Sequence, residues 1–361
     1  MRGSITRTAP SAGPAHRLAT ADSRRGRGYP AAAGLRWARG RSDSRRYVAA
    51  GRGPKSRCRP GAEVRAGRGT VAPCKFENQV ALSVGCVEQR TERQLRRTDA
   101  TFQAAVRGLP DLPRPPLPPD WLVAEMVERY LVVQESGAAS GQSIVEVGSG
   151  GQALATIPLA HRVGESGRVV AVERERWDRF REIVTASGFG PRIRPVRADA
   201  RRLPFDAGTF RLATCIHGVR SLGDDERCVQ VFREMLRVAR RLFVAESLPV
   251  GRTVAQRAHL TMYEIREEVF LATTGRRDDR RYRSIDDLRA LVERAGGVVE
   301  DCRTLEPDLP HALAYFPRSL VEAVPDPPLR SRLEDRWDRA VEELRRSGED
   351  HPPVGVVLAR A

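Results

Sequence analysis

Strand-like and helix-like patterns of apolar residues alternate along the chain from about residue 120 onward. Short runs typical of strands occur at 143–147, 168–173, 192–197, 210–215 and 241–246. Segments with helical spacing of apolar positions lie between them, at 152–162, 175–187 and 226–239. This alternation with short links predicts a doubly wound, Rossmann-like α/β fold, in which helices cover both faces of a largely parallel sheet.

The pattern changes after Glu246. The expected elements are an amphipathic helix at 252–273, a helix at 285–295 capped by Ser284, a strand at 298–304, a charged helical segment at 316–346 and a last strand at 354–359. We therefore divide the chain into residues 1–97, a proline-rich connector with one helix at 98–142, and a domain at 143–361. Helical insertions near 250–283 and 306–350 are expected to cover the site or to contact another subunit.

The positive charge of the chain is confined to its first part. The 361 residues carry a net charge of +16; residues 1–97 hold 22 Lys and Arg against 6 Asp and Glu, which leaves 40 of each sign in the rest. Residues 1–97 lack a periodic apolar pattern and are expected to be a disordered Arg-rich tail. Three interpretations remain open: a nucleic-acid-binding arm, an organelle transit peptide, or translated DNA upstream of the true start.

The cysteines and the hydropathy of the chain indicate in which compartment the protein is expected. None of the six cysteines forms a Cys-x-x-Cys pair, so neither a metal site nor a disulfide framework is expected, and a reducing cytoplasm fits. The chain has no apolar run of 18 residues and no signal-peptide pattern. The expected location is the cytoplasm, or an organelle if the tail is a transit peptide.

Acidic and glycine residues lie where the first two strands end. The first strand ends in Glu146-Val147-Gly148-Ser149-Gly150, and a glycine turn can approach a ligand closely because it has no Cβ. Glu173 ends the second strand, and a carboxylate can accept both hydroxyl hydrogens of a ribose. Ligands of open parallel sheets bind beyond the carboxyl ends of the strands, so both positions predict a nucleotide-type site. The alternatives are an ordinary turn and a surface acid.

Two further strand ends carry candidate residues. Asp199 follows the third strand, where its carboxylate suits an adenine amine and the N–H of Ala200 suits a ring nitrogen; the alternative is a turn-forming aspartate. Cys215 and His217 end the fourth strand, where a backbone carbonyl or a small side chain would face the reacting end of the ligand. His217 is a candidate base, with a packed histidine that orients the turn as the alternative.

These motifs together resemble the class I S-adenosylmethionine-dependent methyltransferases, and in particular the small-molecule (methyltransferase type 11-like) group. The resemblance is carried by Glu-Val-Gly-Ser-Gly-Gly at 146–151, by Glu173, by the segment 198–210 with its Leu-Pro-Phe, and by Phe-Arg-Glu-Met-Leu-Arg-Val at 232–238. It covers about residues 120–305 and the last strand.

The resemblance implies a seven-stranded sheet with an antiparallel final strand, and S-adenosylmethionine as cofactor. The implied contacts are Glu146, Gly148, Ser149 and Gly150 to the methionine part, Glu173 to the ribose, Asp199 and Ala200 to the adenine, and Cys215 to the methionine amine or sulfonium. The chain departs from the family at Gln152, where a third glycine is usual.

The expected reaction is in-line methyl transfer to a small-molecule acceptor, for which a base is needed only if the nucleophile holds its proton tightly. An NAD-binding oxidoreductase is one alternative, because Gly148-x-Gly150-x-x-Ala153 also fits its fingerprint, but Glu146 would repel a pyrophosphate. An RNA methyltransferase that uses the tail and a non-catalytic binding protein of the same fold are the others.

Overall fold

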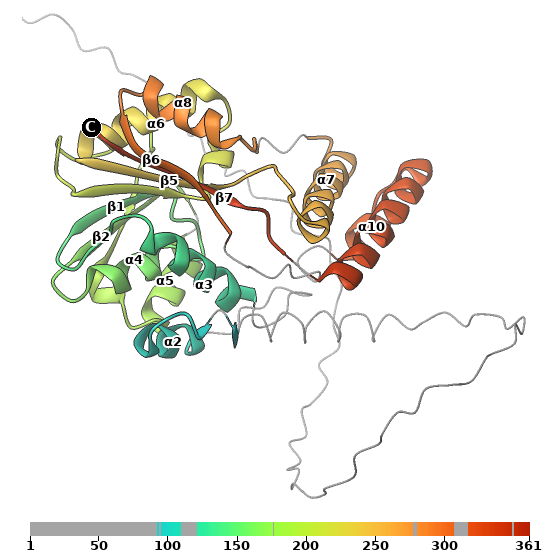
Figure 1. Ribbon diagram of the computed structural model, residues 1–361, viewed down its shortest axis with the longest axis horizontal. Helices are drawn as coiled ribbons and strands as arrows, with labels where there is room; N and C mark the ends of the chain where they lie inside the picture. The colour runs from blue at the N-terminus through green and yellow to red at the C-terminus, as the bar shows by residue number, and fades with distance from the viewer. Residues whose placement is uncertain are drawn as a thin grey trace, which may run out of the picture. The chain divides into compact units, whose positions relative to one another are not determined.

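Figure 1 shows the computed structural model of the chain. It describes residues 92–93, 95–109, 121–175, 177–276, 280–306, 317–348 and 350–361. Almost all of the predicted tail and most of the proline-rich connector lie outside these ranges. Residues 95–97 are described although composition assigned them to the tail, and Leu95 is buried in the core.

The strands form one seven-stranded sheet in the order β3-β2-β1-β4-β5-β7-β6. Their bounds are β1 Ser143–Val147, β2 Arg168–Glu173, β3 Ile193–Arg197, β4 Leu212–Ile216, β5 Arg241–Ser247, β6 Val298–Leu305 and β7 Val354–Arg360. Strands β1 to β5 pair in parallel, whereas β7 runs antiparallel to both β5 and β6. The doubly wound α/β class and the antiparallel final strand are therefore confirmed.

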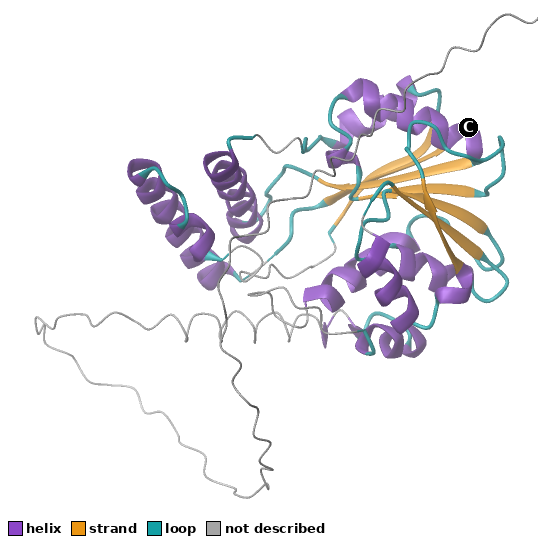
Figure 2. Cartoon of the chain, turned by 180° about the vertical axis from the view of Figure 1, so that it is seen from behind, coloured by secondary structure: helices purple, strands orange, loops and turns teal. Residues whose placement is uncertain are grey.

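Helices cover both faces of this sheet (Figure 2). The helices around the sheet are α2 Ala100–Arg107, α3 Trp121–Gln134, α4 Thr156–Val163, α5 Trp177–Ala186, α6 Asp225–Val238 and α8 Ile285–Arg294, with short 3-10 turns η1 Gly190–Arg192 and η2 Val219–Ser221. One core cluster joins α2, α3, α4 and α5 to the sheet, and a second joins α6 and α8 to it. Helices on both faces explain why the central strands read as continuous apolar runs rather than as alternating ones.

Helix α4 starts four residues later than the apolar spacing predicts. The chain makes turns after Gly150, and Ala153 adopts a left-handed backbone conformation with φ of 51°. This conformation is uncommon for a residue with a side chain, and Ala153 is fully buried, so packing holds it there. The delayed start lengthens the loop between β1 and α4, which is the loop that carries the predicted cofactor residues.

Three further helices form a separate apolar cluster. They are α7 Val254–Thr274, α9 Arg318–Glu322 and α10 Pro327–Ser347, and α7 lies beside α10 in Figures 1 and 2. The charged segment 316–346 is helical, as expected, and consists of the two helices α9 and α10. Pro327 starts the second one, where a proline without an N–H is tolerated, and Asp326 caps it.

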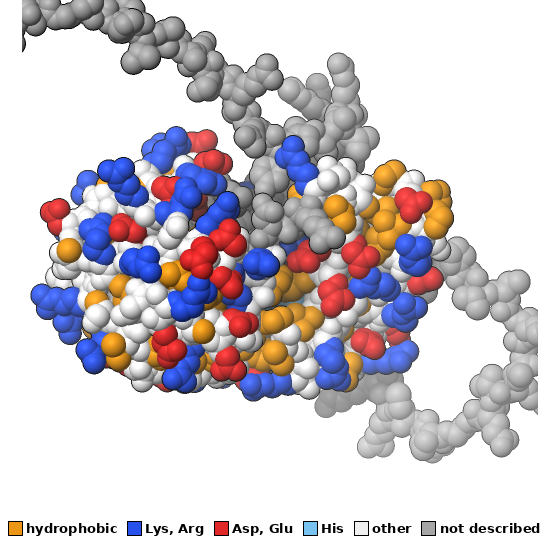
Figure 3. All heavy atoms as spheres, turned by 90° about the horizontal axis from the view of Figure 1, so that it is seen from above, with side chains coloured by type: hydrophobic (Ala, Val, Ile, Leu, Met, Phe, Trp, Pro, Cys, Tyr) orange, Lys and Arg blue, Asp and Glu red, His pale blue; other side chains and the backbone are white. Residues whose placement is uncertain are grey.

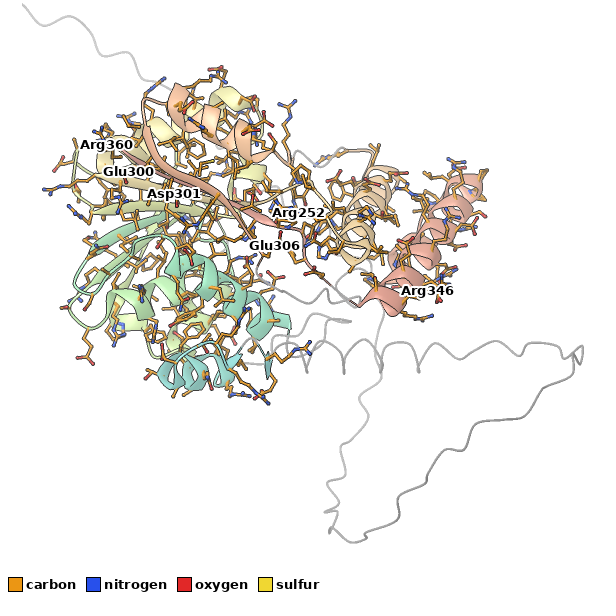
Figure 4. All side chains as sticks on the ribbon, in the orientation of Figure 1. Arg252, Glu300, Asp301, Glu306, Arg346 and Arg360 are labelled. Atoms are coloured by element: carbon orange, nitrogen blue, oxygen red, sulfur yellow. The ribbon has the colours of Figure 1, made fainter. Side chains whose placement is uncertain are left out.

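Polar contacts fasten the start of α7 to the end of β6. The Arg252 guanidinium lies 2.8 Å from Oε1 of Glu306, and the side-chain amide of Gln256 donates to Oε2 of the same carboxylate at 3.1 Å (Figure 4). The same Gln256 forms a capping box with Thr253. The first turn of α7 is thereby attached to the edge of the sheet at which the parallel strands end. Among the described residues, no helix is both long and apolar enough to cross a membrane.

Glycine at the start of β2 is required by packing rather than by conformation. A Cβ on Gly167 would lie 2.4 Å from the Cβ of Val163 and 2.5 Å from its carbonyl oxygen, whereas a Cβ on Gly190 would have no neighbour closer than 3.8 Å. We predict that Gly167→Ala lowers the free energy of unfolding by about 1–3 kcal/mol, and that Gly190→Ala changes it by less than about 0.5 kcal/mol. Denaturant unfolding of both variants measures this; equal stability would contradict the clash.

Candidate active site

The loop after β1 forms a tight turn at the point where strand order reverses. Gly148 and Gly150 have φ of 78° and 65°, a region that other residues enter only with strain. The N–H groups of Gly148 and Ser149 both donate to the carbonyl of Val172, at 2.9 and 3.3 Å. The turn is therefore attached to β2 and lies between β2 and β4, at the switch point where open sheets bind ligands.

Glu173 closes this turn. Its Oε2 accepts a hydrogen bond from the N–H of Gly150 at 3.1 Å, and its Oε1 accepts one from the N–H of Arg174 at 2.7 Å. The two positions predicted from separate strand ends thus meet directly. The carboxylate is only half-buried, which leaves it accessible to hydroxyl groups of a ligand.

Glu146 lies beneath the turn and is almost fully buried. Its side chain accepts a hydrogen bond from the hydroxyl of Thr156 at 2.5 Å. Burial raises the pKa of Glu146 to about 7, and the neighbouring charge of Glu173 adds to this, whereas the Thr156 hydrogen bond opposes it. A cationic group brought next to this carboxyl would favour its ionised form.

Three buried polar atoms around the turn have no hydrogen-bond partner in the described part of the chain. They are Oγ of Ser149, Nε2 of Gln152 and Oγ1 of Thr214, which lies opposite Glu146 in the β1–β4 register. Most buried polar atoms in folded proteins are paired, so such a cluster is typical of a place where a ligand supplies the partners. Hydroxyl and amide groups beside a buried carboxyl suit the carboxylate and ammonium of an amino acid, so these residues fit the methionine part of S-adenosylmethionine.

Asp199 and Ala200 lie on the loop after β3, as predicted, but Asp199 has a partner within the chain. Its carboxylate accepts hydrogen bonds from the backbone and the guanidinium of Arg201, the shortest at 2.6 Å. These bonds hold the pKa of Asp199 down to about 2. The Arg201 side chain therefore occupies much of the carboxylate edge that sequence analysis assigned to an adenine. Ala200 is half-buried against the second core cluster.

The end of β4 approaches the glycine turn closely. A Cβ on Gly148 would lie 4.0 Å from the Cα of Gly218, and a Cβ on Gly218 would lie 3.0 Å from Sγ of Cys215. The Cys215 side chain packs in the second core cluster, and burial raises the pKa of its thiol. Cys215 therefore offers its backbone rather than its side chain to this edge of the sheet.

His217 is held between two buried carboxylates. Its Nε2 lies 3.2 Å from Oε1 of Glu128, and its Nδ1 lies 3.2 Å from Oγ of Ser247 and 3.5 Å from Oε1 of Glu246. Burial, together with the charge of Arg129, lowers the pKa of His217 well below its usual value, so the ring is neutral. A neutral ring can donate to only one of the two carboxylates.

Arginines compensate both carboxylates. Burial alone would raise the pKa of Glu246, but Arg220, whose Nε lies 3.3 Å away, and the His217 ring outweigh it and hold it at about 2. Glu128 is in contact with Arg129, which also lies 2.9 Å from Glu125. The result is a buried network of acids, cations and one imidazole at the carboxyl ends of β4 and β5.

Sequence analysis did not find this network. Glu246 ends an apolar strand, which is the same signal that selected Glu146 and Glu173, so the rule on strand ends was sufficient to find it. Glu128 is buried on α3, but Glu125 and Arg129 lie in the same turn, so no clear sequence signal marked it. Arg220 had no signal either, because the fold alone brings it to Glu246. No group of three metal-ligating side chains occurs in the described ranges.

The order and direction of the strands, with a glycine turn and an acid at the switch point, define a nucleotide-type cofactor-binding protein of the Rossmann-like class. Residues 144–241 match the model of a methyltransferase domain family. The structure resembles a cyclopropane-fatty-acyl-phospholipid synthase-like protein from Lactobacillus casei, with a TM-score of 0.56 and 16% identity over 73% of this chain and 100% of that one. That likeness shows the fold.

Two curated relatives extend the comparison. The ubiquinone/menaquinone biosynthesis C-methyltransferase UbiE of Idiomarina loihiensis is 30% identical over 136 residues, 36% of this chain and 52% of the relative. The protein of the same name from Hahella chejuensis is 24% identical over 180 residues, 46% of this chain and 72% of the relative. The chain thus spans about half the length of the Idiomarina relative and about seven tenths of the length of the Hahella relative. Residues 144–241 are therefore similar to a methyltransferase domain.

The raised pKa of Glu146 predicts a pH-dependent cost to stability. Between pH 4.5 and 7 the unfolded chain loses this proton while the folded chain keeps it, so rising pH destabilises the fold, by about 3 kcal/mol once both forms are ionised. The Gln side chain of Glu146→Gln does not titrate. We therefore expect the free energy of unfolding of this variant, relative to that of the wild type, to be higher at pH 8 than at pH 4 by up to about 3 kcal/mol. Denaturant unfolding at the two pH values measures the difference.

The matched control is Glu175→Gln, which makes the same change at an exposed position beside the site. This variant should keep the wild-type dependence of stability on pH. If Glu146→Gln gains nothing at pH 8 relative to pH 4, the buried carboxyl does not carry the cost.

Proposed function

We propose that the protein transfers the methyl group of S-adenosylmethionine to a small-molecule acceptor. The observation that carries this proposal is the convergence of the glycine turn, Glu146 and Glu173 at the switch point, together with the partnerless polar atoms beside them. An acid in the turn suits the ammonium of methionine and disfavours a pyrophosphate, so methyl transfer is preferred to NAD chemistry. Bound S-adenosylmethionine supplies an electrophilic methyl group on a sulfonium.

The cofactor contacts follow from the geometry of the turn. Glu146 would accept from the ammonium, and Glu173 would accept from the ribose hydroxyls while it keeps the N–H of Gly150. Gln152, which stands where the family has a glycine, would donate its buried Nε2 to the methionine carboxylate. Asp199 would contact the adenine edge after Arg201 turns aside, and Ala200 would offer its N–H there.

The acceptor would bind on the other side of the turn, above β4 and β5. His217 is the candidate base there: its ring is neutral, and the imidazolium formed by taking a proton would lie between the carboxylates of Glu128 and Glu246. The hydrogen bond and the charge of Glu246 favour that imidazolium and oppose the burial and the Arg129 charge that lower the pKa of His217. Alignment of the nucleophile with the methyl–sulfur bond supplies most of the rate in such a reaction.

A small-molecule acceptor in the cytoplasm is supported by the surface and by the cysteines. Figure 3 shows Lys and Arg side chains mixed with Asp and Glu on the face in view, without a continuous basic patch of the kind that binds RNA. The described cysteines, Cys215, Cys228 and Cys302, are all free thiols, as a reducing compartment favours. Almost all of the Arg-rich tail lies outside the described residues.

The role of Glu173 in cofactor binding is tested by Glu173→Ala. Loss of its hydrogen bonds to the ligand and to Gly150 should weaken the binding of S-adenosylmethionine by about tenfold to a hundredfold. Isothermal titration calorimetry on the full chain measures the dissociation constant. Glu175→Ala removes an exposed acid from the same charged run and should leave the dissociation constant within about twofold. Equal weakening of cofactor binding in the two variants would show that Glu173 has no specific role in binding the cofactor.

The role of His217 is tested by His217→Ala. If His217 is the base, cofactor affinity should stay near that of the wild type, and turnover should fall by about a hundredfold or more. Turnover is followed by the formation of S-adenosylhomocysteine with a phenol, quinone or amine that the wild type methylates. His161→Ala, a histidine change on α4, is the control and should retain turnover. Unchanged turnover in His217→Ala would remove this residue from the mechanism.

A further inference from the structure

The neutral ring of His217 carries one proton, and the place of that proton decides which nitrogen can take up another. Strand β4 ends at Ile216, and His217 follows it with φ of 52°, a left-handed conformation that few residues with a side chain adopt. The N–H of His217 donates to the carbonyl of Ala245 on β5 at 2.7 Å. This bond attaches the strained turn to the neighbouring strand and so fixes the start of the side chain.

The contact between His217 and Glu128 requires a proton on one of the two groups. Nε2 of His217 lies 3.2 Å from Oε1 of Glu128; the His217 side chain is 4% exposed and that of Glu128 is fully buried. The other oxygen of this carboxylate contacts the guanidinium of Arg129, which favours its ionised form. A carboxylate offers only lone pairs, so the contact joins a donor to an acceptor only if Nε2 carries the proton.

The other ring nitrogen has a donor beside it. Nδ1 lies 3.2 Å from the hydroxyl of Ser247, which can donate as well as accept. Nδ1 also lies 3.5 Å from Oε1 of Glu246, at the outer limit of a hydrogen bond. That oxygen accepts from the N–H of Ser247 at 3.1 Å and lies 3.3 Å from Nε of Arg220. A proton on Nδ1 would instead leave the lone pair of Nε2 facing the Glu128 carboxylate.

The other charged and titratable groups around the ring keep it neutral. Burial and the charge of Arg129 lower the pKa of His217 well below its usual value, and the charge of Arg220 acts in the same direction. The ring of His351 lies 6.5 Å away between centroids, and burial lowers its pKa to about 3, so it adds no charge. His217 therefore holds a single ring proton at neutral pH, and its contact with Glu128 selects Nε2 for it.

We propose that Glu128 is a positioning residue that holds the proton of His217 on Nε2 and leaves Nδ1, beside Ser247, as the nitrogen that takes up a proton during methyl transfer. The inference rests on the proposed function, because it names the basic atom of the candidate base. In that step the acceptor atom gives up its proton as it gains the methyl group, and the electron pair of the methyl–sulfur bond stays on sulfur. The proton ends on Nδ1, where the charge of Glu246 favours it.

Glu128→Gln tests the assignment because its amide has one acceptor and one donor group. The guanidinium of Arg129 only donates, so the amide oxygen is expected to face Arg129 and the amide NH₂ to face Nε2 of His217. Nε2 then accepts, and the ring proton is expected on Nδ1, where Ser247 and Glu246 can accept it. A substitution of nearly equal size should therefore invert the tautomer of His217.

The tautomer is measured by long-range ¹H–¹⁵N correlation NMR of the full chain with labelled histidines, because protonated and bare ring nitrogens differ in chemical shift. The signals of His217 are those missing from the spectrum of His217→Ala. We expect the wild type to carry the proton on Nε2 and Glu128→Gln to carry it on Nδ1. The ratio of the two tautomers should change by about tenfold or more, the effect of one mismatched buried hydrogen bond.

Two further variants separate Glu128 from its neighbours. Glu125→Gln makes the same exchange one turn earlier on α3, at the other carboxylate that lies beside Arg129, and should keep the proton on Nε2. Ser247→Ala removes the hydroxyl beside Nδ1 but keeps Glu128, and should also keep the proton on Nε2. Inversion of the tautomer in either variant would mean that Glu128 does not decide it, which overturns the inference.

Turnover connects the tautomer to the reaction. Because Nδ1 already holds a proton in Glu128→Gln, kcat should fall by about a hundredfold or more, while the dissociation constant of S-adenosylhomocysteine should stay within about twofold. Glu135→Gln, at an acid beyond the end of α3 that pairs with Arg303, is the control and should retain turnover. An inverted tautomer with unchanged turnover would overturn Nδ1 as the nitrogen that takes the proton.

The spectra separate this inference from the proposed function. A wild type with its proton on Nδ1 overturns the role of Glu128 without any change at that residue, so misfolding of Glu128→Gln cannot protect the inference. A Glu128→Gln variant with the proton still on Nε2 overturns it as well. A chain that does not bind S-adenosylhomocysteine contradicts the proposed function instead, and the tautomer measured without ligand then decides by itself whether Glu128 orients His217.

Discussion

The close approach of two backbone segments at the β1–β4 boundary is the constraint on which the site depends. The strand order reverses there, and open parallel sheets bind their ligands at such a boundary. A Cβ on Gly148 would be in van der Waals contact with the Cα of Gly218, and a Cβ on Gly218 would crowd Sγ of Cys215. The hydrogen bond from the N–H of Gly150 to Glu173 attaches the turn to the end of β2.

Buried charge is the second constraint on the site. Three buried glutamates differ in the groups that compensate their negative charge. Glu246 stays ionised because Arg220 and His217 compensate its burial. Glu146 has a hydroxyl rather than a cation as its partner, so its pKa rises to about 7 and part of its population is protonated near neutrality. Glu128 is paired with Arg129 and His217. Of these three acids, Glu146 is the one without a cationic side chain as partner among the described residues.

Much of the candidate site was accessible from sequence because its residues follow apolar runs. Glu146 and Glu173 were both found from strand ends, and the structure brings Glu173 to the turn that follows Glu146. The network around His217 was not found, because its members come from α3, from the turn and η2 after β4, and from β5, and their chain separations follow no motif. The role assigned to Asp199 overlooked Arg201, since a local side-chain bond of this kind competes with a ligand without changing the sequence pattern.

The amino-acid sequence alone determined the doubly wound class, the positions of the parallel strands and the glycine turn with its acids, because apolar periodicity and turn chemistry act over short distances. It did not determine where α4 begins, which depends on the packing of Ala153, nor the separation of α9 from α10 despite the visible Pro327. Only the tertiary structure decided that His351 lies near His217, because an antiparallel last strand returns the chain to the carboxyl edge. Charge pairing and ring contacts between distant segments have no local signature, so folding had to reveal them.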